Sequence, residues 1–367
     1  MPNPTHWTPT LDRLAALAAL APSSHNGQPW LLLGLSARRY EREMGPLHTE
    51  DEATELSLVR ATHSLLVCID RRRALRALPA LERETRMSVG GFASLLMNLL
   101  RLSGFEVAVQ WLPEHWQPAS VSGRRRTRDT EPVLVLHLRG PAGGARPLLH
   151  PLAQWIQRRT TVRAPYLDGA AERPHASPVP SLPHRLGACG HWQLVEPGPL
   201  LTQLARFYRD HAAEDFRHSA AWRETYAHLH FGPAQDAAAR GDRVGIAVEA
   251  LFGRLPAWRR RLLQTVLHPR VLPWIGPLGL HARIGRDFEQ LVQHSSGVLV
   301  LVQDPSAPDA DTRRQQLLAG EAMLDRWLAA TRDGLALQPL SVALQHTAVE
   351  LELRRLLAQD APLLFIA

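Results

Sequence analysis

The chain has 367 residues, 45% of them hydrophobic, which is enough to bury a large core and favours two domains over one. All 42 basic residues are arginine and outnumber the 35 acidic ones, but the densest basic run, at residues 124–128, has no aromatic neighbours, so we expect no nucleic-acid role. The sequence has only two cysteines, Cys68 and Cys189, so we expect no disulfide framework and no cysteine-based metal site.

The first half of the chain predicts alternating helices and strands. An apolar helix over residues 11–20 should end where Pro22 biases Ala21 out of the α region. Buried strands are expected over residues 31–33 and 65–69, separated by a polar surface insertion at 36–62. A helix over about 87–103 should end at Gly104, followed by strands at 105–112 and 133–138 and a glycine-rich hinge at 140–144.

The second half repeats part of this layout. A strand at 297–302 precedes a helix at 313–332, which Gly334 should end before an extended stretch at 335–340. The segments VGGFASLLMNLLRLSGFEVAVQWLP and LAGEAMLDRWLAATRDGLALQPLS therefore share an order of elements, as an internal duplication would leave. The alternative is two unrelated amphipathic helices that each end at a glycine.

Residues 21–30, APSSHNGQPW, form the most informative motif. Ser23, Ser24, Asn26 and Gln28 offer donors and acceptors that suit the edge of a flat heterocycle, directly after an apolar helix. The alternative is an ordinary polar loop followed by a core Trp30.

A second motif, RRTTVR at residues 158–163, is basic. Guanidinium groups bind phosphate oxygens bidentately and a threonine hydroxyl adds a donor, so Arg158 and Arg163 are candidate phosphate ligands. The alternative is a solvated arginine cluster at the end of a helix.

The first motif resembles the PSxxNxQPW segment of FMN-dependent nitroreductases, and its SSHNGQPW form resembles the two-domain, single-chain branch of that superfamily, the Acg type. In ordinary members two subunits build each flavin site, and the second subunit supplies an arginine-rich phosphate segment similar to residues 158–163. The resemblance implies that one polypeptide provides both parts, as a fused pseudo-dimer. It also implies hydride transfer from NAD(P)H through flavin N5 to a small acceptor, with no catalytic side chain required.

Residues 241–251 resemble a further family segment, in which the backbone approaches the flavin ring. Gly245 and Ile246 carry this resemblance, although Ala247 stands where the family usually has proline. The family commonly ends with a basic residue, whereas this sequence ends in LLFIA, so Arg354 or Arg355 is a candidate substitute. A degenerate relative that has lost its flavin and acts as a scaffold is a further alternative.

Residues 251–280 are apolar, interrupted by proline, and contain Trp258 and Trp274. They fit a lid over the flavin, or a basic helix lying on an anionic membrane surface, and we favour the lid. The spacing of His211, His218, His228 and His230 matches no zinc pattern, so we expect no metal. His25 either touches the flavin or its substrate, or packs on Trp30.

These observations predict an α+β, nitroreductase-like fold in two fused halves, residues 1–148 and 149–367, with one FMN at their junction. An FMN-sequestering protein with a closed lid and little turnover is the alternative function. We expect a cytoplasmic monomer or homodimer without stable membrane insertion, since balanced charges precede the short apolar run at 14–21 and no run is long enough to span a bilayer. The expected cofactor-binding residues are Ser23, Ser24, His25, Asn26, Gln28, Arg158, Arg159, Thr160, Arg163, Gly245 and Ile246.

Overall fold

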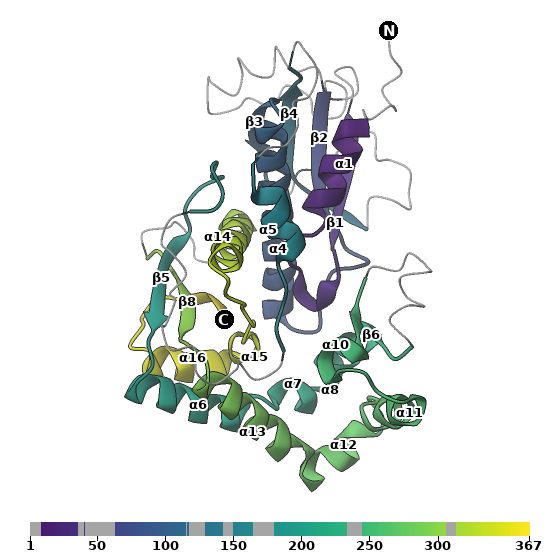
Figure 1. Ribbon diagram of the computed structural model, residues 1–367, viewed down its shortest axis with the longest axis vertical. Helices are drawn as coiled ribbons and strands as arrows, with labels where there is room; N and C mark the ends of the chain where they lie inside the picture. Colours follow the sequence, from purple (N-terminus) through teal and green to yellow (C-terminus); the bar gives the residue numbers. More distant parts are fainter. Residues whose placement is uncertain are drawn as a thin grey trace.

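The computed structural model describes residues 9–35, 40, 63–114, 116, 129–141, 150–163, 180–232, 244–305 and 313–367. Almost all of the insertion predicted at 36–62, the basic run at 124–128, most of the hinge at 140–144 and residues 241–243 lie outside these ranges. Within them the chain mixes helices and strands, with two sheets on either side of a pair of long helices (Figure 1).

The first sheet is antiparallel, with strand order β1-β2-β4-β3. Its strands are β1 (Trp30–Leu35), β2 (His63–Asp70), β3 (Glu106–Trp111) and β4 (Thr130–Arg139). Side chains of β2 alternate between two apolar clusters, with Leu65 and Val67 in one and Leu66 and Cys68 in the other. Both faces of this sheet are therefore covered, as the near-continuous apolar run of β2 predicts.

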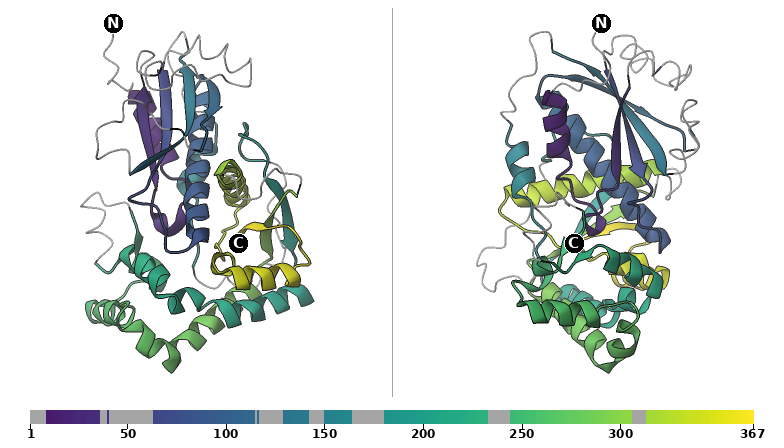
Figure 2. Two further views of the ribbon diagram at one scale, coloured as in Figure 1. Left: turned by 180° about the vertical axis from the view of Figure 1, so that it is seen from behind. Right: turned by 90° about the vertical axis from the view of Figure 1, so that its right-hand side faces the viewer.

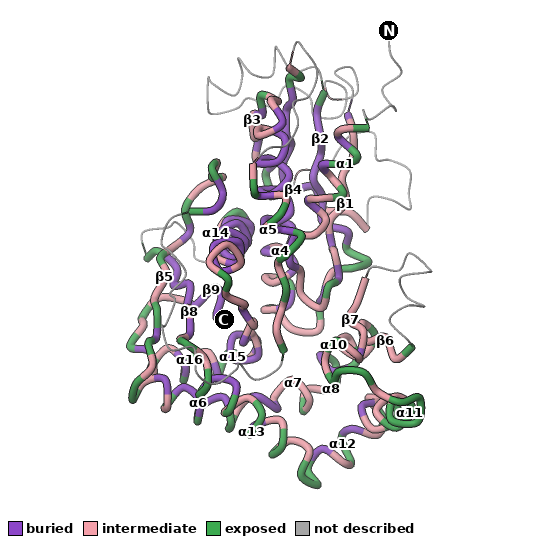
Figure 3. The backbone as a smooth tube through the Cα atoms, viewed as in Figure 1, coloured by how far each residue is buried: buried purple, intermediate pink, exposed green. Residues whose placement is uncertain are grey.

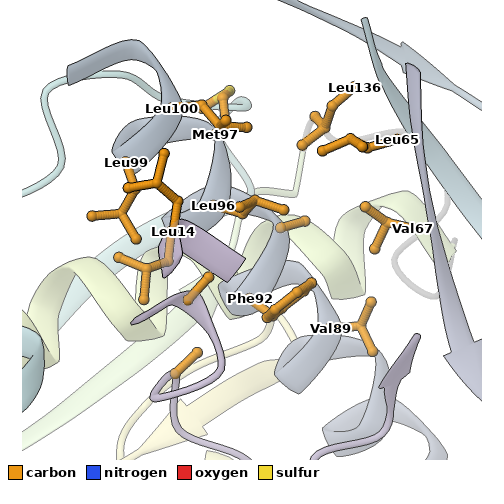
Figure 4. Packing of buried hydrophobic residues seen from close by; sticks show 14 of the residues in the cluster. Leu14, Leu65, Val67, Val89, Phe92, Leu96, Met97, Leu99, Leu100 and Leu136 are labelled. Carbon is orange, nitrogen blue, oxygen red and sulfur yellow. The ribbon is translucent and has the colours of Figure 1, made fainter. Parts of the chain in front are cut away.

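Helices α1 (Pro9–Ala18) and α4 (Pro79–Leu102) cover one face of that sheet. Figure 4 shows Phe92 and Leu96 of α4 facing the strands, with Leu14 of α1 packed beside the helix. Helix α4 begins earlier than predicted because Pro79 occupies its first turn, where proline costs no hydrogen bond. It ends before Gly104, whose φ of 90° is left-handed, as predicted.

The second sheet has strand order β5-β8-β9 and is also antiparallel. Its strands are β5 (Gly190–Val195), β8 (Val298–Gln303) and β9 (Leu363–Ile366). The two sheets share a local plan: a strand paired antiparallel to both neighbours is followed along the chain by the long helix of its half. This strand is β2 before α4 in the first sheet and β8 before α14 (Arg313–Arg332) in the second.

Helices α4 and α14 cross at the centre of the molecule, as the two views of Figure 2 show. Glycines permit this close approach, because a Cβ on Gly90 would collide with the carbonyl of Leu317 and one on Gly320 with the carbonyl of Met87. Beside the crossing, the buried carboxylate of Glu321 accepts a hydrogen bond from Ser94 Oγ at 2.7 Å.

Helix α5 (Leu152–Arg158) packs against α1 and α14. The remaining elements lie around the second sheet and below the first in Figure 1. They are α6 (Pro199–His211), α7 (Glu214–Arg217), α8 (Ser219–Ala227), β6 (Leu229–His230), β7 (Ile246–Ala247), α10 (Val248–Phe252), α11 (Ala257–Val266), α12 (Leu272–Ile275), α13 (Leu280–Gln293), α15 (Val342–Gln345) and α16 (Thr347–Leu356). Short 3-10 turns occupy η1 (Ser24–Asn26) and η2 (Gly276–Leu278).

The apolar core does not divide at the predicted boundary near residue 148. Leu152 and Ile156 of α5, and Leu317 of α14, belong to the same buried cluster as Leu14 of α1. The two halves therefore share a core. Their division into residues 1–148 and 149–367 stays a prediction, based on the order of the elements along the sequence.

Both cysteines, Cys68 and Cys189, are free and buried. Burial raises the pKa of the Cys68 thiol to about 12 and that of the Cys189 thiol to about 11. Among the residues that the structure describes, no helix has the length and apolarity that crossing a bilayer requires.

Candidate functional site

The turn between α1 and β1 has an unusual backbone. His25, Asn26 and Gln28 have φ values of 50°, 52° and 46°, in the left-handed region that residues other than glycine rarely adopt. Asparagine tolerates this conformation, whereas histidine and glutamine do so at a cost in free energy. Such strain concentrates at binding sites, so the turn is a candidate functional element.

The two serines hold the turn in place. Ser23 Oγ accepts a hydrogen bond from the Gln28 backbone N–H at 3.1 Å, which closes the turn on itself. Ser24 Oγ donates to Glu84 Oε2 at 2.5 Å, and the Ser24 N–H donates to Ser88 Oγ at 3.2 Å, which fixes the turn to α4. The structure therefore gives Ser24 a positioning role within the protein, and contact of either serine with a flavin stays a prediction.

Glu84 extends this anchor to the second half of the chain. Its Oε1 accepts a hydrogen bond from Gln345 Nε2 of α15 at 2.7 Å, while burial raises the pKa of the carboxyl. One carboxyl group thus connects the turn to α15, a contact between residues 261 positions apart. Sequence inspection gave no reason to select Glu84, which lies on a helix turn with several charged residues.

Asn26 and Gly245 pair reciprocally. Asn26 Nδ2 donates to the Gly245 carbonyl at 2.9 Å, and the Gly245 N–H donates to the Asn26 carbonyl at 3.1 Å. Gly245 has a φ of 94°, and a Cβ there would lie 2.6 Å from the His228 carbonyl and collide with the His230 ring. The missing Cβ at Gly245 thus serves a contact within the protein. An approach of this backbone to a flavin is a separate prediction.

Ile246 continues the same connection. Its N–H donates to the His228 carbonyl at 2.8 Å, and β7 pairs in parallel with β6. His228, which sequence reasoning considered only as a metal ligand, instead lies with its ring centroid 5.8 Å from that of His25. Among the described residues, no group of histidine, cysteine, aspartate and glutamate side chains is arranged to hold a metal ion.

The basic motif at residues 158–163, the arginine segment, lies at the end of α5. Arg158 and Arg163 are exposed, whereas Arg159 is partly buried with its guanidinium 5.0 Å from the centre of the Trp327 ring. The Thr160 carbonyl accepts a hydrogen bond from Trp327 Nε1 at 3.3 Å, so helix α14 holds the backbone of the arginine segment. The sequence alone did not distinguish Arg159 from Arg158.

The structure brings the turn and the arginine segment together. Arg159 Nη2 donates to the carbonyl of Leu20, immediately before the turn, at 3.5 Å. Arg163 lies close enough to His25 to affect its titration: burial first, then His228 and Arg163, lower the pKa of His25 to about 4. His25 is therefore neutral at pH 7. Two segments about 130 residues apart thus lie close together, as the family resemblance implied.

Three polar atoms at this place have no hydrogen-bond partner although solvent does not reach them: Nε and Nη1 of Arg159, and Nδ1 of His25. Burial and the neighbouring Arg163 lower the pKa of Arg159 to about 10, so it remains a cation at neutral pH. Buried hydrogen-bond donors in native proteins normally have an acceptor. Arg159 is a partly buried cation with two nitrogen atoms that have none, so its position suits an anion.

Residues 251–280, the predicted lid, are held by hydrogen bonds from helix α8. Trp222 Nε1 of α8 donates to the Leu267 carbonyl at 2.7 Å, and Tyr226 OH donates to the Gln264 carbonyl at 3.0 Å. Trp258 and Trp274 are 62% and 79% exposed, so neither indole is packed over the turn in this structure. The lid stays a prediction. Arg354 and Arg355, the proposed substitutes for a terminal basic residue, lie on α16, which packs against α6 and α15.

No family model matches the chain. The sequence is 28% identical over 340 residues to a curated Serratia protein described as a probable NAD(P)H nitroreductase, PigM. The aligned region covers 92% of this chain and 81% of that protein. The similarity to this nitroreductase therefore extends over most of the sequence and into both halves of the chain.

Proposed function

We propose that this nitroreductase-like chain is an FMN-dependent NAD(P)H oxidoreductase that binds one FMN between the turn and the arginine segment. The observation that carries the proposal is the position of Arg159. Its guanidinium lies against the carbonyl that precedes the turn and has two N–H groups without a partner. The description of the Serratia relative as a probable NAD(P)H nitroreductase supports NAD(P)H as the reductant.

The residues fit the phosphate group of FMN. A buried N–H group without a partner costs on the order of 1–3 kcal/mol, and a phosphate oxygen would remove this cost through a charge-assisted hydrogen bond. Arg163 adds a second positive charge at an exposed position near His25. Arg158 and Thr160 are exposed beside them and complete the expected phosphate ligands.

The turn provides the surface for the ring. Asn26 is exposed and its backbone is fixed by Gly245, and Gln28 follows in the same strained turn. Behind them Trp30 stacks on Phe92 with ring centroids 4.9 Å apart, which makes the base of the turn rigid. Neutral His25 is able to donate or accept one hydrogen bond without adding charge. Bound FMN would supply hydride transfer from NAD(P)H to a small acceptor.

We further propose that the chain is a tandem duplication whose halves form an internal pseudo-dimer. The shared strand plan of the two sheets supports this, with β1-β2-β4 corresponding to β5-β8-β9. The matched glycines on α4 and α14 support it as well, since paired subunits related by a two-fold axis make reciprocal contacts. This arrangement would let one polypeptide supply both parts of the flavin site.

The exposure of Trp258 and Trp274 favours turnover over sequestration. A sequestering protein would need bulky side chains stacked over the flavin, and these two indoles face solvent. A closed lid in the flavin-bound protein is the arrangement that would support the sequestering alternative instead.

The proposal is tested on the purified protein by its visible spectrum and by mass spectrometry of the ligand released on denaturation. We expect one FMN per chain, retained or restored by reconstitution. Anaerobic mixing with NADH or NADPH should bleach the flavin band, and a nitroaromatic or quinone acceptor should restore it. A flavin that binds but resists bleaching would support sequestration, and a chain that never binds FMN would overturn both.

A further inference from the structure

The charge of the chain is concentrated in one region. Residues 250–286, here called the peripheral segment, contain seven arginines and no acidic residue. The rest of the chain then has 35 basic and 35 acidic residues, so the whole formal net charge of +7 lies in this segment. Two of its arginines form ion pairs with acidic residues that flank the segment: Arg260 with Glu249 at 2.9 Å and Arg283 with Asp287 at 3.9 Å.

The same segment exposes most of the large apolar side chains that reach the surface. Seven large hydrophobic residues are exposed among the described residues, and five of them lie here. They are Phe252, Trp258, Leu262, Trp274 and Leu278. Four of the five form two pairs in which a leucine follows a tryptophan by four residues, Trp258 with Leu262 and Trp274 with Leu278. This spacing places Trp258 and Leu262 on one face of α11.

The opposite face of the segment is anchored, so the exposed residues belong to a folded element. Leu267 and Leu272 are buried with Trp222 in a small apolar cluster, and α8 adds two hydrogen bonds from Trp222 and Tyr226. Helix α11 has no buried residue and lies at the lower right edge of the molecule, where Figure 3 colours it mostly as exposed. Its outer face is available to a partner.

Charge and side-chain type select the partner. Arginines beside exposed tryptophan and leucine on a helix are the composition of elements that lie in the headgroup region of an anionic bilayer. Tryptophan suits this depth because its ring is apolar and its N–H remains hydrated. A second copy of the chain is a poor partner for this face, because the seven arginines of one segment would repel the seven arginines of the other.

We propose that the peripheral segment docks the protein onto the surface of anionic lipid bilayers, with Trp258, Leu262, Trp274 and Leu278 inserted at the level of the headgroups. The protein remains peripheral, since none of the described helices is able to span the bilayer. This docking is independent of the flavin site, which lies at the turn and the arginine segment.

The test is co-sedimentation of the full chain with vesicles of phosphatidylcholine alone or mixed with phosphatidylglycerol. The parent should bind the mixed vesicles, with affinity falling as salt rises, and should stay in solution with phosphatidylcholine alone. Trp258→Ala with Trp274→Ala should weaken binding by at least about tenfold. Arg259→Gln with Arg261→Gln should weaken it by about 25-fold, from about fivefold per arginine.

Matched variants elsewhere separate this effect from general loss of charge or apolar surface. Leu194→Ala with Leu351→Ala removes the two exposed apolar side chains outside the segment, and Arg206→Gln with Arg355→Gln removes two exposed arginines. Both should bind as the parent does, and circular dichroism should show that every variant is folded. Quenching of tryptophan fluorescence by brominated lipid should fall in the double tryptophan variant.

Three outcomes would overturn the proposal. In the first, the parent fails to bind mixed vesicles, and in the second, the double tryptophan variant binds them as tightly as the parent. In the third, sedimentation shows a dimer that the tryptophan variant dissociates while vesicles bind neither form, which would assign the face to self-association. Protection of Trp258 and Trp274 from acrylamide by FMN, without vesicle binding, is a form of the first outcome and would assign the segment to a lid.

Discussion

Gly90 and Gly320 are reciprocal partners at the crossing of α4 and α14. The Cα of Gly90 faces the backbone of Leu317, three residues before Gly320, and the Cα of Gly320 faces the backbone of Met87, three residues before Gly90. Each helix therefore offers a glycine to the same position on the other. This relationship brings the two halves into backbone contact and places α14 where Trp327 supports the arginine segment.

Replacing either glycine by alanine should destabilise the protein. The added methyl would collide with a helix backbone, which cannot rotate away, so α4 and α14 must separate. Overpacking of this kind costs about 1–3 kcal/mol, partly offset by about 1 kcal/mol from the better helix propensity of alanine. Urea unfolding of Gly90→Ala and Gly320→Ala measures the loss.

The control for these variants is Gly198→Ala, where a Cβ would meet no atom within 4 Å. It should unfold at about the same urea concentration as the parent. Equal stability of Gly90→Ala and the parent would contradict the close crossing.

The pairing of Asn26 with Gly245 predicts that Gly245→Ala loosens the turn. A Cβ there would lie 2.6 Å from the His228 carbonyl, and the left-handed φ adds strain. Hydrogen exchange at the Gly245 and Ile246 amides should accelerate. Gly253→Ala isolates the strain term, because Gly253 has a φ of 72° but no atom within 4 Å of a Cβ. If the amides at positions 245 and 246 exchange equally fast in both variants, the collision of the Cβ with the His228 carbonyl is not what loosens the turn.

His137 should make the protein sensitive to acid. Its ring is buried between Ser64 Oγ and Gln110 Oε1, and burial lowers its pKa to about 4. Because the folded pKa lies below the unfolded value, protonation favours unfolding. The stabilising contribution is complete above about pH 6.5 and is lost as the pH falls through about 4, a change on the order of 3 kcal/mol.

Urea unfolding at pH 7 and pH 4.5 tests this dependence. His137→Gln should be less stable than the parent at pH 7 but should lose less stability on acidification. Exposed His191→Gln should lose as much as the parent. A parent-like pH dependence in His137→Gln would assign the acid sensitivity to other groups, including His25.

Local pattern predicted much of this structure. The bounds of α14 follow from apolar spacing and Gly334, and the turn follows from Pro22 and the Ser-Asn-Gly composition. The meeting of the turn with the arginine segment came from the family resemblance. Arg159 could not be chosen over Arg158, because its burial depends on Trp327 in a helix more than 150 residues away. The role of Glu84 and the contact of His228 with His25 were missed for the same reason, since the partners are distant in sequence.

The most direct test of the account is a titration of flavin-free protein with FMN, followed by quenching of flavin fluorescence. The parent should bind one FMN per chain, and Arg159→Met should bind about 10- to 100-fold more weakly, as expected for lost hydrogen bonds to a charged group. Arg206→Gln should match the parent. Absence of saturable binding by the parent, or equal affinity in Arg159→Met, would contradict the claim that the turn and the arginine segment form an FMN site.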